Sequence, residues 1–476
     1  SAASDVYKRQ VTVRSIIKHI PGKNKLQTER NHTMENQNAY KKPVTLKNIL
    51  KFAIPTIAMS VFMSFYTMVD GLFVSNLIGT DALSAINLTA PVIQLVTAIS
   101  TMLATGGSAV IMKKMGEQKP KEAREDFTFL IIVNVAVGLI MSLLGYLVME
   151  NIFGNMGLSG EVAGYCTRYL SRYLLFTIPI LLMNNFTLYM IASEKASLSL
   201  LCSVSGGVLN MILDYLFIAL FHMGIEGAAI ATGLGYSVTA VAGLFVFSQK
   251  KNLLHFTKPS FRFKVLVNAA ANGCSEMATA LITGIVTMMF NWTMLHYVGE
   301  NGVAAVTIIM YVLMFASSLY TGYSYGVAPM LSYCYGEKNH KKLKKLVAVS
   351  LKIIAVISLV TAAASFAATK PLVSVFARPD NPVHDLAVTG NRICTLALLF
   401  IGFNIFASGM FTALSNGIVS AVLAFSRSFV FMLITMLILP AILGVNGIWL
   451  ATPAAELMAL ILSAAMFVKH RKRYQY

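Results

Sequence analysis

Two aspartates in otherwise apolar stretches carry the chemistry that the sequence offers. Asp70 lies in YTMVDGLFV, and Asp214 lies in NMILDYLFI with Asn210 one helical turn before it. Thr232 follows in GIEGAAIATGLG. Counted at 1.5 Å per residue from the nearest loops, Asp70, Asp214 and Thr232 all lie about 9–12 Å deep on the same side. Two carboxylates, an amide and a hydroxyl in one layer suit a hard cation, and buried carboxylates also suit proton uptake.

Long apolar segments must position these residues. The chain is 56% hydrophobic and only 12% charged, whereas soluble domains have roughly 25% charged residues. Residues 127–149 contain no charge and are long enough to cross a bilayer. The alternative, a soluble helical core, would need polar outer faces. We therefore predict an all-α integral membrane protein with twelve transmembrane helices, over residues 46–77, 82–113, 126–150, 162–193, 197–221, 225–249, 262–297, 302–335, 342–369, 384–414, 418–443 and 447–469.

Basic residues are concentrated in alternate connections. The basic connections are residues 41–51, 113–124, 250–264, 338–345 and 469–473. The remaining connections are nearly free of lysine and arginine, except 370–383, which holds Lys370 and Arg378. Since cytoplasmic loops carry the excess of positive charge, we predict a multi-pass protein of the plasma (inner) membrane with both termini cytoplasmic. This distribution accounts for the net charge of +18, so we expect a lipid bilayer and no nucleic acid as partner.

The two halves of the chain repeat each other at one constant offset. Gly106 matches Gly326, Gly116-Glu117 matches Gly336-Glu337, and Gly224-x-x-Gly227 matches Gly444-x-x-Gly447, always 220 residues apart. Six helices per unit is an even number, so the repeats are parallel and should form two lobes around a central cavity. The predicted organisation is a leader over 1–33 that is artefactual or disordered, a first lobe over 34–249 (helices 1–6), a cytoplasmic linker over 250–261 and a second lobe over 262–476 (helices 7–12).

The polar layer of the first lobe has no copy in the second. At the same offset, Asp70 corresponds to Phe290, Asn210 to Val430 and Asp214 to Ile434. Ionisable residues within a bilayer are costly and mark function by default, so we predict that the ion site belongs to the first lobe. The alternative is that the two aspartates only cap polar neighbours or line a wet cavity.

Other residues are secondary candidates. Glu276, Arg427 and Glu456 also lie within predicted spans and are candidates for coupling ion binding to transport. The alternative is that Glu276 and Arg427 simply form an ion pair with each other. A soft, adaptable substrate cavity is predicted from Met68, Tyr311, Met314, Phe315, Tyr320, Tyr323 and Tyr325. The alternative is that these side chains face lipid or the protein core. The five cysteines are scattered singly and form no metal framework.

The stretches around Asp70, Asn210, Asp214 and Thr232, with the later echo GVNGIWLATPAAE, resemble the multidrug and toxic compound extrusion (MATE) family, and its DinF-like branch in particular. The resemblance covers about residues 40–470. It implies a two-lobed monomeric antiporter that exports small amphipathic, often cationic compounds in exchange for H⁺ or Na⁺, without a further cofactor. It also implies that these four residues form the cation site and that Pro55 bends the first helix. The NorM-like branch uses second-lobe acids on helices 7 and 10; here helix 10 has none, and Glu276 is a partial match.

Two other classes of function remain as alternatives. A flippase for lipid-linked saccharides belongs to the same superfamily, but it would usually have a strongly cationic cavity, and here only Arg427 lies deep. A membrane-embedded enzyme would need convergent catalytic residues. The sequence contains no Walker A, HExxH or GxSxG motif, so we predict no enzymatic activity.

Overall fold

Long helices make up the described part of the chain, as the apolar segments predict. The computed structural model describes residues 39–78, 80–155 and 160–476, so the predicted leader lies outside the described residues. Within them, eleven helices are long and apolar enough to cross a membrane. A twelfth span is a pair of helices, Glu161–Leu175 and Thr177–Ala192, bent by 54°. The prediction of an all-helical protein with twelve spans is therefore confirmed.

The first six spans comprise seven α-helices and one π-helical segment. These are α3 (Leu46–Leu77), α4 (Thr80–Gly116), α5 (Pro120–Asn155), α6 (Gly160–Leu175), α7 (Thr177–Ala192), α8 (Ala196–Asp214), the π-helical η2 (Tyr215–Leu220) and α9 (Gly224–Ser248). A short 3-10 helix, η1 (Ala39–Lys41), precedes them and belongs to a separate unit that ends at Pro43. Helix α3 continues through Pro55.

The last six spans follow in the same order. They are α10 (Phe263–Tyr297), α11 (Glu300–Gly336), α12 (His340–Ala367) with the short α13 (Thr369–Ser374), then α14 (Pro382–Cys394), η3 (Thr395–Ala397) and α15 (Leu398–Ala413), then α16 (Gly417–Phe425), η4 (Ser426–Phe431) and α17 (Met432–Leu443), and finally α18 (Val445–Tyr474). The tenth span changes to a 3-10 helix at η3, and the eleventh contains the π-helix η4. These irregular turns are not foreseen by hydrophobic periodicity.

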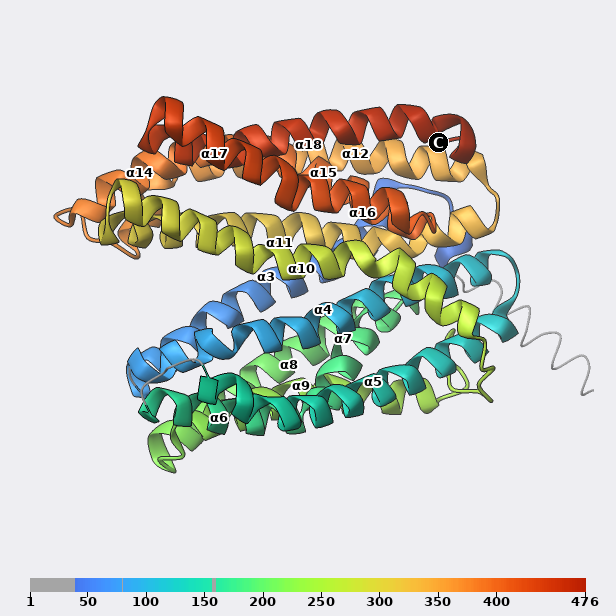
Figure 1. Cartoon of the computed structure of the whole chain (residues 1–476). Helices are drawn as coiled ribbons and strands as arrows, with labels where there is room; N and C mark the ends of the chain where they lie inside the picture. Colours follow the sequence, from blue (N-terminus) through green and yellow to red (C-terminus); the bar gives the residue numbers. More distant parts are fainter. Residues whose placement is uncertain (1–38, 79, 156–159) are drawn as a thin grey trace, which may run out of the picture. The chain divides into compact units, whose positions relative to one another are not determined.

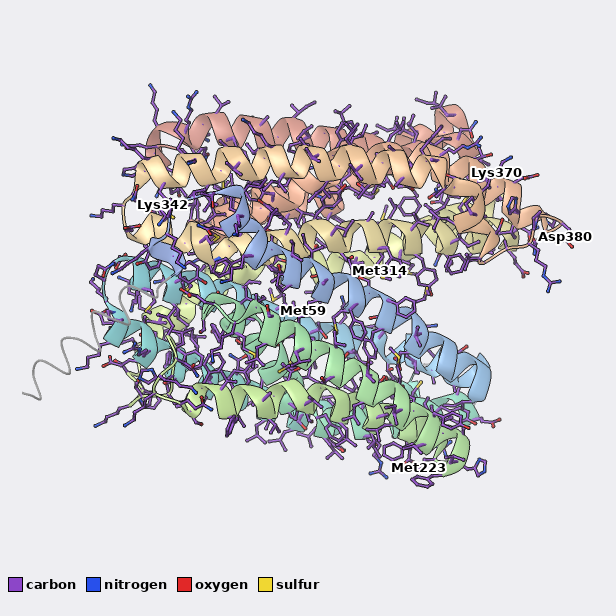
Figure 2. The ribbon with its side chains drawn as sticks, turned by 180° about the vertical axis from the view of Figure 1, so that it is seen from behind. Met59, Met223, Met314, Lys342, Lys370 and Asp380 are labelled. Atoms are coloured by element: carbon purple, nitrogen blue, oxygen red, sulfur yellow. The ribbon has the colours of Figure 1, made fainter. Side chains whose placement is uncertain are left out.

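Two groups of helices lie side by side in the unit that begins at Val44. Helices α4 to α9 gather on one side, and α11 to α18 gather on the other (Figure 1). The groups meet where α10 packs along α4 and α11 packs along α3. Lys342 lies at the opposite end from Met223, Lys370 and Asp380 (Figure 2). The connections predicted to lie on opposite sides of the membrane are thus at opposite ends of the helices.

Glycines allow the two groups of helices to approach at backbone distance. A Cβ built on Gly116 of α4 would lie 2.1 Å from Tyr333 O, and one built on Gly336 of α11 would lie 2.0 Å from Lys113 O. Gly336 is the repeat counterpart of Gly116, and Tyr333 is the counterpart of Lys113, each 220 residues later. The two contacts are therefore reciprocal, as a twofold arrangement requires. The same ends of the two repeats therefore meet, which is the arrangement expected of parallel repeats.

A second close approach joins α4 to α10. A Cβ on Gly273 would lie 1.9 Å from the backbone oxygen of Met102, whereas one on Gly284, eleven residues further along α10, would meet nothing within 4 Å. Backbone atoms cannot turn aside as a flexible side chain can. This contact therefore requires glycine at position 273, and it brings the backbones of α4 and α10 together near the middle of α4.

We predict that Gly273→Leu moves the lobes apart, because its side chain has no space beside Met102. The measurement is the distance between spin labels on Lys121→Cys and Lys341→Cys, two exposed positions at the starts of α5 and α12. The mean distance should increase. Gly284→Leu is the matched control on the same helix and should leave the distance distribution unchanged. The same distances in both variants and the parent protein would show that the glycine contact does not hold the lobes.

Candidate functional site

The four polar residues of the first lobe are brought together by α3, α8 and α9. Asp70 lies on α3, Asn210 and Asp214 lie on α8, and Thr232 lies on α9. Asn210 and Asp214 are fully buried, and Thr232 is 6% exposed. The amide of Asn210 donates a hydrogen bond of 3.4 Å to the Thr232 hydroxyl, which itself donates to Ala228 O. The helical turn between Asn210 and Asp214 aligns both side chains on the face of α8 that packs against α9 and α3.

The two carboxyl groups face each other across α3 and α8. Asp70 and Asp214 lie close enough to influence each other, and Asn210 lies close to Asp214. Among the described residues, no hydrogen-bond partner within normal distance meets either carboxyl oxygen of Asp214, Oδ1 of Asp70 or Oδ1 of Asn210, although all four atoms are buried. Burying an unpaired carboxylate is costly, and two adjacent carboxylates repel. This arrangement can lower its energy by taking up a proton or by holding a cation between the oxygens.

Three tyrosines that the sequence analysis does not predict lie near the carboxyl pair. Tyr66 of α3, Tyr169 of α6 and Tyr236 of α9 all lie close enough to interact electrostatically with Asp70. Tyr66 and Tyr236 also interact with each other. Tyr66 could have been found, because it lies one helical turn before Asp70 on the same helix. The other two depend on how α6 and α9 are rotated, which the spacing of residues along one helix does not reveal.

A central cavity of about 400 Å³ lies between the lobes. From the first lobe it is lined by α3, α4, α7 and α8, and from the second by α11. Met59 and Met314 approach it from opposite lobes near the middle of the helices (Figure 2). Its described lining consists of methionines, small hydroxyl residues, Asn184, Tyr325 and a few apolar side chains, and contains no lysine, arginine, aspartate or glutamate. This composition suits amphipathic molecules of varied shape, because methionine adapts its packing to the ligand.

Two of the seven residues predicted for the cavity line it. Met314 and Tyr325 do so, together with Ser318 and Thr321, which repeat at helical spacing along one face of α11. Met68, Tyr311, Phe315, Tyr320 and Tyr323 are not among its lining residues. Their assignment to this cavity is therefore corrected.

Three of the aromatic residues among these five pack elsewhere. Tyr320 is 1% exposed and donates a hydrogen bond of 3.0 Å to Leu398 O within the second lobe. Tyr323 is fully buried beside Phe406, and Tyr311 stacks on Phe376. Aromatic content alone could not separate the cavity face of α11 from its core face. Helical spacing from Met314 would have excluded Tyr320 and Tyr323.

Two smaller cavities adjoin the central one. The first has Tyr66 and Tyr236 in its wall and shares Met63, Met183 and Ser203 with the central cavity. It therefore lies between the central cavity and the carboxyl pair. The second contains Glu276 of α10 and shares Leu188 and Tyr325 with the central cavity. Acidic groups thus flank the central cavity from both lobes without lining it.

The second lobe is apolar where the first lobe has its carboxyl pair. Phe290, the counterpart of Asp70, is 2% exposed and packs in the hydrophobic core. A small cavity beside it is lined by Trp449, Thr452 and apolar side chains. Ile434, the counterpart of Asp214, is 38% exposed on the outer surface of the protein.

The second lobe instead contains a buried ion pair. Arg427 Nε donates to both carboxylate oxygens of Glu456, at 2.8 and 3.1 Å. The amide of Asn404 donates to Glu456 Oε2 at 2.7 Å, and its own oxygen accepts a hydrogen bond from Ser463. The suggestion that Arg427 pairs with Glu276 is therefore wrong as to the partner. Glu276 interacts with Arg427 only at longer range and also faces Tyr325.

The sequence of the chain is similar to one protein family and to individual members of it. A profile of the family described as MatE matches residues 55–216 and 277–459. Multidrug export protein MepA of Staphylococcus saprophyticus is 23% identical over 442 residues, which cover 91% of this chain and 95% of that protein. MepA of Staphylococcus haemolyticus is 24% identical over 429 residues, covering 90% of this chain and 94% of that protein.

Solved structures share the fold. The crystal structure of MATE in complex with MaL6 has a TM-score of 0.86 at 24% identity and covers 92% of this chain and 98% of its own. A multidrug resistance MATE family transporter of the MOP superfamily, solved in an outward-facing conformation, has a TM-score of 0.84 at 24% identity, covering 90% of this chain and 95% of its own.

We predict that Asp214→Asn stabilises the folded protein at pH 8. The amide removes a buried charge and can donate to Asp70, so we expect the free energy of unfolding to rise by about 1–2 kcal/mol. Asp126→Asn is the matched control. Asp126 is equally buried, but it pairs with Lys114 and with Arg262, so its loss should lower the free energy of unfolding by about 1–3 kcal/mol. Thermal melting of the detergent-purified variants measures both. A destabilised Asp214→Asn protein would contradict our description of the carboxyl pair.

Proposed function

Since the chain belongs to the MatE family, the multidrug and toxic compound extrusion transporters, we propose that it is a secondary active antiporter that exports small amphipathic, often cationic compounds in exchange for H⁺ or Na⁺. The curated relatives are named multidrug export proteins. Transport requires no covalent chemistry on the substrate. The coupling ion is the only additional species that the proposal needs.

The observation that carries the proposal is the carboxyl pair beside the central cavity. Asp70 and Asp214 are positioned to bind a cation or a proton, with Asn210 and Thr232 as further oxygen ligands. Tyr66 and Tyr236 lie between this pair and the cavity. Ion binding at the pair would change the charge behind these tyrosines. A substrate in the cavity and an ion at the pair would then influence each other through the shared wall of α3 and α8.

Two parallel lobes supply the means of alternating access. They meet at one end through the glycine contacts, and the cavity lies between them. Rocking of the lobes about such a central site would expose it to each side in turn, and bending of α3 at Pro55 would help to move the cavity wall. The positive-inside pattern supports an orientation with both termini cytoplasmic, and we propose that this transporter lies in the plasma membrane. We propose that it works as a monomer of the DinF-like branch.

The composition of the cavity argues against the flippase alternative. A carrier of lipid-linked saccharides would bind anionic phosphates, and lysine or arginine would be expected at the cavity wall. The described lining contains neither residue, and Arg427 is committed to Glu456 in the second lobe. The methionine and hydroxyl lining is better suited to amphipathic drugs.

We predict that Asp70→Asn reduces coupled export at least about tenfold, because the isosteric amide removes the one carboxyl group of α3, while the protein remains folded in the membrane. The assay is ethidium efflux from proteoliposomes, with a pH gradient and a Na⁺ gradient imposed separately. The gradient that drives efflux in the parent protein identifies the coupling ion.

Asp385→Asn serves as the control, because the side chain of Asp385 is 97% exposed on α14. It should export at the parent rate. Undiminished efflux by Asp70→Asn at equal incorporation would remove Asp70 from the coupling mechanism.

A further inference from the structure

The bent span of the first lobe, formed by α6 and α7, reaches from the ion site to the central cavity. The two helices meet at an angle of 54° on either side of Phe176. We propose that Phe176 is a positioning residue about which this span pivots, so that a change of ion occupancy at the carboxyl pair moves the part of the cavity wall that α7 forms. This inference rests on the proposed antiport function and names the element that couples the ion to the substrate.

A proline fixes the position of the bend. Pro179 lacks the amide proton that would bond to Leu175 O four residues earlier, and in a straight helix its ring would clash with that carbonyl. The neighbouring carbonyl, Leu174 O, accepts hydrogen bonds from the hydroxyls of Thr177, at 2.8 Å, and of Ser142 on α5, at 2.9 Å. Hydroxyl groups that bind the carbonyls beside a break make it tolerable within a membrane. The sequence therefore places a break at this point of the span.

The ring of Phe176 rests on α9, the helix that carries Thr232. A Cβ built on Gly233, the residue after Thr232, would lie 2.1 Å from Cγ of Phe176, so the ring fills the space that only a glycine leaves free there. One helical turn before Phe176, Arg172 Nε donates to a carboxylate oxygen of Glu226 on α9 at 2.9 Å. Helix α6 is thus attached to α9 at its end, and a displacement of α9 at Thr232 reaches Phe176 directly.

The two arms of the bent span carry residues of both sites. Tyr169 of α6 lies near Asp70 of the carboxyl pair. Met183 and Asn184 of α7 line the central cavity. Because hinge motions are absorbed by a few residues at the ends of otherwise rigid elements, a rotation at Phe176 displaces the cavity lining of α7 relative to the ion site.

The corresponding span of the second lobe lacks the residues that make this pivot. At the repeat offset of 220, the three positions hold Leu396 for Phe176, Leu399 for Pro179 and Pro453 for Gly233. The side chain of Leu396 is 48% exposed, and its span continues through the 3-10 helix η3 as a single span. The pivot therefore belongs to the lobe that contains the carboxyl pair, as a coupling role requires.

The test follows the bend through the distance between its two ends. Spin labels are placed on Glu161→Cys at the start of α6 and on Ser197→Cys directly after α7, both exposed positions, and Cys274 is replaced by serine because the four other cysteines are buried. Complete straightening of the 54° bend would lengthen this distance by about 5 Å.

In the parent protein we expect the mean distance to change by at least about 2 Å when the pH is lowered from 8 to 5 or when NaCl replaces choline chloride. Asp70→Asn/Asp214→Asn is the control for the origin of the change. It contains no carboxyl pair, so its distance should respond to neither condition.

Removing the ring should weaken this response. Phe176→Ala leaves Gly233 uncovered, and we expect it to show less than half of the parent's change in distance. Phe176→Leu keeps most of the apolar bulk and should retain more than half. Leu396→Ala, at the matched position of the second lobe, should respond as the parent does.

Thermal melting separates this role from a merely structural one. The ion that changes the distance should still raise the Tm of Phe176→Ala, because its carboxyl pair is intact and a ligand of the folded state stabilises it. A merely structural role for Phe176 would lower the Tm of Phe176→Ala and leave the ion-dependent change in distance at its parent size.

Two results would overturn the inference. One is a parent protein whose distance responds to neither ion, and the other is a Phe176→Ala protein whose distance changes as much as the parent's. If Phe176→Ala does not fold, Pro179→Ala decides in its place, because it restores the missing amide proton and stiffens the span; an undiminished change in that variant would equally overturn the inference. These distances require no transport, so a pivoting span in a protein that exports no ethidium would contradict the proposed function alone.

Discussion

Charge buried in a membrane protein must be compensated, and this constraint distinguishes the two lobes. In the first, Asp70 and Asp214 face each other without a cationic partner among the described residues. In the second, Glu456 has Arg427 at 2.8 Å. An uncompensated pair is energetically costly unless an ion or a proton binds. The cost makes the first lobe sensitive to the ions and protons in solution, whereas Glu456 of the second lobe is neutralised by Arg427.

The surrounding helices can link ion binding at the carboxyl pair to the central cavity. Tyr66 and Tyr236 lie near Asp70 and also line a small cavity that adjoins the central one. The cavity itself is shared by both lobes, and its walls carry no formal charge among the described lining residues. The glycine contacts of α4 with α10 and α11 allow the lobes to pack at backbone distance at one end. Small changes in the first lobe can therefore alter how α3 packs against the second lobe, with which it shares a long contact.

The spans, the repeat and the depths of the polar residues could be predicted from the sequence, because each depends on counting residues along single helices. The apolar segments predicted twelve spans, and the constant offset of 220 residues predicted a parallel repeat, with which the reciprocal contact of Gly116 and Gly336 agrees. The depths of Asp70, Asn210, Asp214 and Thr232 followed from distances to the nearest loops, and the structure brings these residues together. Their role as ion ligands stays a prediction.

The contacts that could not be predicted depend on how each helix is rotated about its axis and on irregular helical turns. Tyr169 and Tyr236 reach Asp70 only through the orientation of α6 and α9. Tyr320 and Tyr323 were predicted to line the cavity because they are aromatic, but they do not lie on the face of α11 that is directed toward the cavity. The partner of Arg427 was missed because depth alone does not distinguish Glu276 from Glu456. The π-helical turn of η4 shifts the register of the side chains around it, and no periodic pattern predicts such a turn.

We expect the carboxyl pair to bind an ion that substrate displaces. The experiment adds ethidium to weakly buffered, detergent-purified protein while a pH indicator follows H⁺ and a radioactive tracer follows Na⁺. We expect the parent protein to release one of these ions as ethidium binds. Asp70→Asn/Asp214→Asn should bind ethidium, as seen by its fluorescence, and release neither. Equal ion release from the parent and the double variant would contradict the account.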